Sequence, residues 1–279
     1  MNECFNKYFI YNSEIKNSEE FDDAMLNKGK SLYEVIRIID GKPLFLDRHL
    51  NRMDNSSKIS KLSLWLNKKR VEEKILQLIK INGVDSGNIK FLFNFQEDVL
   101  KKEQNKTFMC YFVKHHYPFK EDYENGVDTI LYHGERNNPN AKIINSDFRS
   151  MVDKEIVAKS AFEAILVDRN GNITEGSKSN IFMIKNNSVL TAPLEDVLPG
   201  VTRNVIMDLC KDLGIELKEE KINYNNLESL EALFISGTSP KVLPIKSIDK
   251  MNFNSAKNEM VLKIMKAYDE AVKKDILSI

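Results

Sequence analysis

The stretch that most constrains this chain runs from Asn138 to Asn180. It begins NPNAKIIN, where Lys142 is the only lysine, and it ends ITEGSKSN, which contains Glu175. An amphipathic run between them predicts a helix near 148–161, and an apolar hairpin follows it. We therefore expect a mixed α/β fold, with the lysine between a strand and a helix and the glutamate at a strand end.

Strands and helices alternate along the rest of the chain. Apolar runs predict strands at 8–12, 31–40, 88–96, 107–114 and 127–133, then the meander AILVD, NITEG, NIFMIK and SVLTAP, then ALFISG. The turns are expected at Asp40-Gly41, Asn170-Gly171 and Asn186-Asn187. Helical spacing predicts helices over DRHLNRMDNSSKISKL and at about 69–82, 202–213 and 255–274.

The sequence HHYP interrupts this pattern near the middle of the chain. Proline and a loss of apolar periodicity are typical of a connection between domains. We therefore expect a domain at 1–114, a linker at 115–121 and a second domain at 122–279.

Composition excludes several classes of protein. The 279 residues contain 41 Lys plus Arg and 41 Asp plus Glu, so there is no basic excess of the kind that a nucleic-acid binder shows. No apolar run approaches the ~20 residues of a membrane span, and the polar start MNECFNKYFIYN is unlike a signal peptide. Three distant cysteines, Cys4, Cys110 and Cys210, predict buried reduced thiols. We expect a cytoplasmic protein with no bound metal.

The segment LPGVTRNVIMDLC predicts an anion site. Gly200 permits an unusual turn, after which Val201 and Thr202 present N–H groups at the start of a helix. The helix dipole and these donors favour a phosphate there. An equally simple alternative is that Thr202 only caps the helix.

Two further segments offer phosphate ligands. SGTSP, with Thr238 and Ser239, ends a strand with hydroxyl donors, although a plain turn has the same composition. Arg52 lies one turn after His49 in HLNR and can hold a phosphate through two hydrogen bonds. Taken alone, Arg52 is as compatible with a solvated helix surface.

Lys142 and Glu175 suggest a specific chemistry. A lysine amine can bond to the aldehyde of pyridoxal phosphate and carry a proton, especially where burial lowers its pKa. A carboxylate can keep the pyridine nitrogen of that cofactor protonated. Small residues after Glu175 let a flat ligand approach the backbone. Each residue alone is also compatible with an ordinary structural place, as a surface lysine or a strand-end carboxylate.

The order of these motifs resembles the class IV pyridoxal phosphate aminotransferases, the group of D-amino acid and branched-chain aminotransferases and aminodeoxychorismate lyase. Six segments carry the resemblance: LYEV (32–35), HLNRM (49–53), ERNNPNAKIIN (135–145), ITEGSKSN (173–180), LPGVTR (198–203) and SGTSP (236–240). The resemblance implies fold type IV, with two α/β domains, the cofactor in the cleft between a small N-terminal and a larger C-terminal domain, and a homodimer.

The resemblance also implies roles for individual residues. Lys142 and Glu175 match the catalytic pair. The cofactor ligands would be Lys142, Glu175, Arg52, Ser179, Asn180, Val201, Thr202 and Thr238. Substrate contacts would come from Tyr33, Lys178 and Ser239.

The substrate side departs from each subfamily. The strand NIKFLFNFQED lacks the Arg and His with which D-amino acid aminotransferases of this group hold the substrate carboxylate, and Asn145 is followed by Ser146 where branched-chain enzymes often have Tyr. The expected activity is an aminotransferase that moves an amino group between an amino acid and a 2-oxo acid. Aminodeoxychorismate lyase, which forms p-aminobenzoate and pyruvate, and a non-catalytic homologue are the alternatives. The amino acid and its chirality stay open.

Overall fold

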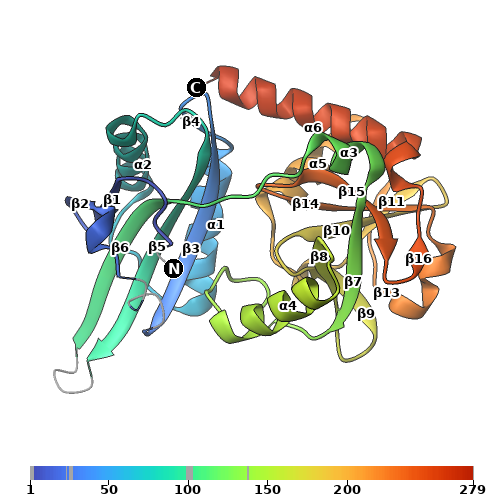
Figure 1. Ribbon diagram of the computed structural model, residues 1–279, viewed down its shortest axis with the longest axis horizontal. Helices are drawn as coiled ribbons and strands as arrows, with labels where there is room; N and C mark the ends of the chain where they lie inside the picture. Colours follow the sequence, from blue (N-terminus) through green and yellow to red (C-terminus); the bar gives the residue numbers. More distant parts are fainter. Residues whose placement is uncertain (1–2, 23, 25–27, 99–102, 137, 279) are drawn as a thin grey trace. The chain divides into compact units, whose positions relative to one another are not determined.

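The computed structural model describes residues 3–22, 24, 28–98, 103–136 and 138–278, which fold into two compact units (Figure 1). The first unit consists of Met1–His116, Ala141–Ile144 and Lys273–Ile279. The second unit consists of Tyr117–Asn140 and Asn145–Val272. The expected domain limits, 1–114 and 122–279, stay a prediction.

Two short segments join the first unit from far along the sequence. Ile143 forms a bridge with Leu32, and the Phe45 amide donates to Asp275 at 2.7 Å. These contacts are long-range, so no local pattern in the sequence predicts them. The first of these segments contains Lys142.

The first unit is built on one antiparallel sheet with the strand order β2-β1-β6-β5-β3-β4. The strands are β1 (Tyr8–Tyr11), β2 (Glu14–Asn17), β3 (Lys30–Ile39), β4 (Lys42–Pro43), β5 (Gly87–Asp98) and β6 (Glu103–Val113). β5 and β6 are longer than predicted, and residues 99–102 between them lie outside the described residues. The Asp40-Gly41 turn is confirmed, because both residues have positive φ and Ile39 pairs with Lys42.

Two helices cover the apolar face of this sheet. They are α1 (Leu46–Ser60) and α2 (Lys68–Asn82), and both pack into the core with the inward residues of β3, β5 and β6. The Asn67 side chain caps α2, and Gly83 ends it with φ of 60°. The buried residues of α1 follow helical spacing and include polar ones: His49, Leu50, Arg52, Met53 and Ser56.

The second unit contains a sheet of ten strands, part of which closes on itself. In spatial order its strands are β12 (Leu217–Glu219), β11 (Ser188–Thr191), β10 (Asn180–Lys185), β14 (Ala232–Gly237), β15 (Lys241–Ile248), β7 (Val127–His133), β8 (Glu163–Val167), β9 (Asn172–Gly176) and β13 (Ile222–Asn223), with β16 (Met251–Asn252) beside β15. β9 also pairs with β10, where Glu175 faces Asn180. The strands from β10 to β9 therefore form a closed ring, and the candidate carboxylate lies where it closes.

The remaining helices flank these strands. They are α3 (Lys120–Asn125), α4 (Ser146–Ala158), α5 (Val201–Asp212) and α6 (Glu259–Ser278), with 3-10 turns at Leu194–Asp196, Tyr224–Ser229 and Ser255–Lys257. The 3-10 turn Ser18–Glu20 belongs to the first unit. The C-terminal helix was predicted at about 255–274, but 255–257 form a 3-10 turn instead. None of the helices in the described parts of the chain is long and apolar enough to cross a membrane.

Among the strands that the sequence prediction missed, β15 is the longest. β15 contains Pro244, and proline within an apolar run argues against a central strand. β15 nevertheless lies between β14 and β7. Its pairing with β7 begins only at Ile245 and shifts register between Ile245 and Ser247, so the proline lies before the paired part on that side.

Candidate functional site

Lys142 is held by its main chain at the edge of the first unit's sheet. The Tyr33 amide donates to the Lys142 carbonyl oxygen at 3.1 Å, and the Lys142 amide donates to Ser56 Oγ at 3.2 Å. The side chain is half-buried, and its Nζ atom lies 4.7 Å from the centroid of the Tyr33 ring. The predicted position between a strand and a helix is confirmed, since β7 ends at His133 and α4 begins at Ser146.

Arg52 belongs to a buried charged cluster rather than to a solvated surface. It is 7% exposed and donates from Nε to Glu34 Oε1 at 2.7 Å and from Nη2 to Glu34 Oε2 at 2.6 Å. His49 Nδ1 lies 2.8 Å from the same Oε2, so it donates to the carboxylate. The alternative of a surface arginine is therefore wrong. The role of Arg52 as a phosphate ligand stays a prediction.

The charges of this cluster are mutually compensating. Burial acts to raise the pKa of Glu34, but the charge of Arg52 and the hydrogen bonds from Arg52 and His49 outweigh it and bring this pKa to about 2. Burial lowers the pKa of His49 and outweighs the hydrogen bond and charge of Glu34, which act to raise it. Glu34 is therefore ionised and His49 neutral near pH 7.

The sequence prediction did not include Glu34 or His49. The sequence did contain a signal for Glu34, because this residue lies on the same inward face of β3 as the apolar Leu32, Ile36 and Ile38. An acidic residue on an apolar strand face needs a buried partner. His49 lies three residues before Arg52, on the same side of α1.

A second lysine lies beside Tyr33 and was also missed. Lys90 on β5 is buried, its Nζ lies 5.3 Å from the Tyr33 ring centroid, and it pairs with Glu3 at 2.7 Å. The Tyr111 hydroxyl donates to Glu3 as well, at 2.9 Å. Lys90 and Lys142 thus both lie against the ring of Tyr33.

Glu175 is fixed in the second unit by two kinds of donor. It is buried, its Oε1 accepts hydrogen bonds from Arg136 Nε at 2.8 Å and from Arg136 Nη2, and its Oε2 accepts one from the Leu198 amide at 3.1 Å. Arg136, which the sequence prediction did not single out, lies within the motif ERNNPNAKIIN. A carboxylate this buried needs such donors, and its role beside a cofactor stays a prediction.

The turn between β9 and β10 is anchored by another buried carboxylate. Glu163 accepts hydrogen bonds from Ser179 Oγ at 3.0 Å and from the Lys178 amide at 2.5 Å. Burial raises the pKa of Glu163 and outweighs these hydrogen bonds, which act to lower it. The Lys178 ammonium pairs with Asp153 of α4 at 2.7 Å. The cofactor role of Ser179 and the substrate role of Lys178 stay predictions.

The start of α5 has the form of an anion site. The residue before the helix is Gly200, so Thr202 is inside the helix and the alternative of a Thr202 cap is wrong. Within the described residues no side chain caps this end. A Cβ atom at Gly200 would lie 1.9 Å from Asn180 Oδ1, so only glycine lets the helix start this close to β10. Asn180 Nδ2 donates to the Leu198 carbonyl at 2.9 Å.

A buried hydroxyl lies next to this helix start. Ser236 on β14 pairs with Asn180 and is 1% exposed, and its Oγ has no hydrogen-bond partner among the residues that the structure describes. Thr238 and Ser239 follow it in the turn between β14 and β15. An uncapped helix start, an unsatisfied hydroxyl and a buried carboxylate are groups that fit the phosphate and the ring nitrogen of pyridoxal phosphate.

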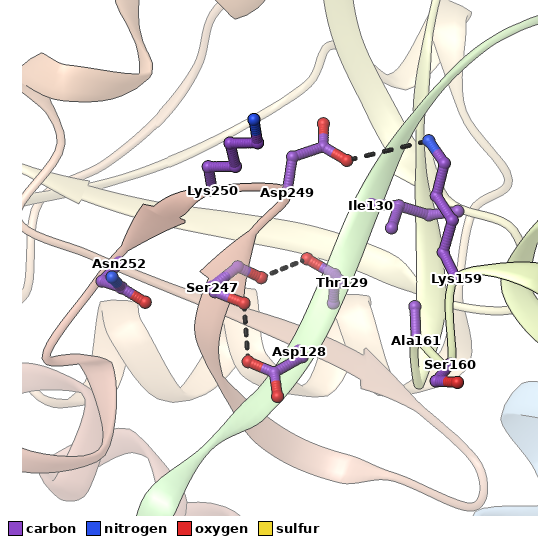
Figure 2. Close-up of a pocket in the computed structure, with 10 residues that line it drawn as sticks. All are labelled: Asp128, Thr129, Ile130, Lys159, Ser160, Ala161, Ser247, Asp249, Lys250 and Asn252. Carbon is purple, nitrogen blue, oxygen red and sulfur yellow. Dashed lines mark hydrogen bonds and ion pairs between the residues drawn. The ribbon is translucent and has the colours of Figure 1, made fainter.

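The candidate residues fall into one group in each unit. The first unit contains Tyr33, Arg52 and Lys142, and the second contains Glu175, Lys178, Ser179, Asn180, Val201, Thr202, Thr238 and Ser239. A polar pocket in the second unit, between β7, β15 and the end of α4, includes none of them (Figure 2). Its side chains bond to one another, as Ser247 does to Asp128 at 2.6 Å.

Comparisons with known proteins find one family. Residues 31–248 match the family model described as amino-transferase class IV. D-alanine aminotransferase of Bacillus licheniformis is 27% identical over 85% of both chains. Branched-chain-amino-acid aminotransferase of Escherichia coli is 30% identical over 80% of this chain and 78% of its own. Aminodeoxychorismate lyase of Bacillus subtilis is 24% identical over 91% of this chain and 89% of its own.

Solved structures show the same fold. The branched-chain aminotransferase of Thermoproteus uzoniensis matches with a TM-score of 0.86 and 23% identity, over 97% of this chain and 96% of that one. The expected type IV fold is confirmed by this match.

Proposed function

Because the chain belongs to the class IV aminotransferases, which work with pyridoxal phosphate, we propose that it moves an amino group between a branched-chain or D-amino acid and a 2-oxo acid. The observation that carries the proposal is the fixed position of Lys142, with its main chain bonded to β3 and α1 and its ammonium against Tyr33. A reactive amine needs this kind of fixed, half-buried place.

The proposal gives each candidate residue a role towards the cofactor. When bound, pyridoxal phosphate supplies an aldehyde that takes up the amino group and a ring that accepts electrons. Lys142 would hold the aldehyde end and then carry the proton as base and acid. Glu175 would hold a proton on the ring nitrogen. Arg52, with Val201, Thr202 and Thr238, would bind the phosphate.

Three residues are proposed to contact the substrate. Tyr33 would line the substrate side, because the Lys142 ammonium lies against its ring. Ser239 and Lys178 are further candidates, although the Lys178 ammonium pairs with Asp153. Residues 88–98 contain Lys90 but neither Arg nor His. The Arg and His pair with which D-amino acid aminotransferases hold the substrate carboxylate is therefore missing from this strand.

Aminodeoxychorismate lyase activity is the second candidate, and the Bacillus subtilis relative favours it. The lyase would use the same lysine but release pyruvate and p-aminobenzoate. A non-catalytic homologue is disfavoured by the presence of both Lys142 and Glu175. We also propose that the protein is a homodimer, on the family resemblance, and that it is cytoplasmic, on the three distant cysteines that predict reduced thiols.

One panel separates these functions. The purified holoenzyme is given D- and L-amino donors with 2-oxoglutarate or pyruvate, and p-aminobenzoate formation is assayed beside it. We expect amino transfer from one chiral series. Release of p-aminobenzoate without amino transfer would replace the first proposal by the second, and inactivity in both assays would contradict both.

A further inference from the structure

Arg136 places its guanidinium on the candidate carboxylate Glu175. Its Nε and Nη2 both donate to Oε1, whereas Oε2 accepts from the neutral Leu198 amide. The Arg136 side chain is 18% exposed and that of Glu175 is 4% exposed. A charge pair therefore lies on one side of the carboxylate, with its acid buried and its guanidinium half-buried.

The neighbours of Arg136 fix the segment that carries it. The Gly134 amide donates to the Val167 carbonyl at 2.9 Å, which ties the segment to the end of β8. Glu135 accepts a hydrogen bond from Arg169 Nε at 2.6 Å. Arg136 thus reaches Glu175 from a short stretch that is bonded at two adjacent positions.

A buried carboxylate can be compensated by a proton or by a cation. Arginine does not lose its own proton in proteins, so Arg136 is a permanent positive charge. Beside a pyridine nitrogen, Glu175 shares one proton that can sit on the carboxylate oxygen or on the nitrogen. A permanent cation closer to the carboxylate favours the arrangement with an ionised carboxylate and a protonated nitrogen.

We infer that Arg136 is a positioning residue that moves the proton shared with Glu175 onto the ring nitrogen of the bound cofactor. The inference rests on the proposed function. Arg136 would act through Glu175 and touch no reacting atom. The proton leaves a Glu175 oxygen and joins the nitrogen lone pair, so no other reactant is needed.

The state of the nitrogen can be observed without turnover. Apoprotein is loaded with pyridoxal phosphate labelled with ¹⁵N in the ring, and the nitrogen resonance reports whether the ring is protonated. We expect a protonated signal in the wild type and in Arg136→Lys, which keeps the charge. Arg136→Gln and Arg136→Met should shift the signal towards the neutral position, as Glu175→Gln does.

Binding gives a second, independent measurement. The dissociation constants of pyridoxal phosphate and of its analogue with CH in place of the ring nitrogen are compared in each variant. The wild type should prefer the natural cofactor by about tenfold or more, the value of one charge-assisted hydrogen bond. This preference should shrink in Arg136→Gln and Arg136→Met, and stay at the wild-type value in Arg70→Gln, an exposed arginine paired with Glu73.

The outcomes separate the inference from its premise. Wild-type nitrogen signals and wild-type preference in the two Arg136 variants without charge would overturn the inference while leaving Glu175 in its role. If Glu175→Gln also behaves as the wild type, the assignment of Glu175 in the proposed function fails with it. If the Gln variant does not fold, the Met and Lys variants still make the comparison.

Discussion

At the residue scale, the place of Lys142 determines which peptide should carry the cofactor. Borohydride reduction of the holoenzyme should fix the label to the peptide containing Lys142, and Lys142→Ala should abolish turnover, because one amine supplies both the bond and the proton transfer. Lys178→Ala is the matched control, since its ammonium pairs with Asp153, and it should keep the label. Mass spectrometry that finds the label on any other lysine would contradict the assignment.

Substitution of Arg52 should change two quantities, the affinity for the cofactor and, because Arg52 is buried, the stability of the apoprotein. Arg52→Ala should weaken cofactor binding roughly ten- to a hundredfold. It should also destabilise the apoprotein by about 3–5 kcal/mol, because Glu34 is left buried without the positive charge that compensates its own. Spectral titration and urea unfolding measure the two effects. The double variant Arg52→Met with Glu34→Leu should regain stability but not affinity. An unchanged dissociation constant in both variants would make Arg52 purely structural.

At the scale of elements, most of the pattern could be predicted from the sequence because it is local. Helical periodicity and the turn residues placed α2, β7 and β10 closely. β15 was missed because Pro244 is locally unfavourable in a strand. The pairing of residues 141–144 with β3 was missed because it joins segments that are distant in the sequence. The candidate lysine and glutamate were found from motifs, whereas their partners Ser56 and Arg136 depend on tertiary packing.

The contact between β10 and the start of α5 gives a prediction at this scale. Gly200→Ala would place a methyl group 1.9 Å from Asn180 Oδ1, so the Asn180 side chain or the first turn of α5 must move. We expect a loss of about 1–3 kcal/mol in stability and weaker binding of phosphate-bearing cofactor, with less effect on binding of the unphosphorylated aldehyde. Adding Asn180→Ala removes the clash and should restore part of both. Equal losses for the two forms of the cofactor would mean that this turn does not hold phosphate.

At the scale of the whole molecule, buried titratable groups give stability a pH dependence. Glu163 has a raised pKa, so its contribution is complete below about pH 4.5 and declines as pH rises through its folded pKa. Glu34 and His49 have lowered pKa values, so their contributions are complete above their unfolded pKa values and decline as pH falls. The two kinds of group therefore oppose each other in mildly acidic solution.

His49 should act first as the solution is acidified. Below about pH 6.5, the unfolded chain takes up a proton at His49 that the folded chain resists, so stability falls with pH. Between about pH 4.5 and 2, Glu34 adds a loss of about 3 kcal/mol, since its folded pKa is about 2. Urea unfolding of the apoprotein from pH 7.5 to 3 measures both.

His49→Asn, which keeps a donor for Glu34 but does not titrate, should flatten the part between pH 6.5 and 5 and leave the steeper acid part. A variant with the wild-type slope above pH 5 would show that His49 is not the group responsible, and that the buried cluster of α1 and β3 does not set the onset of acid unfolding.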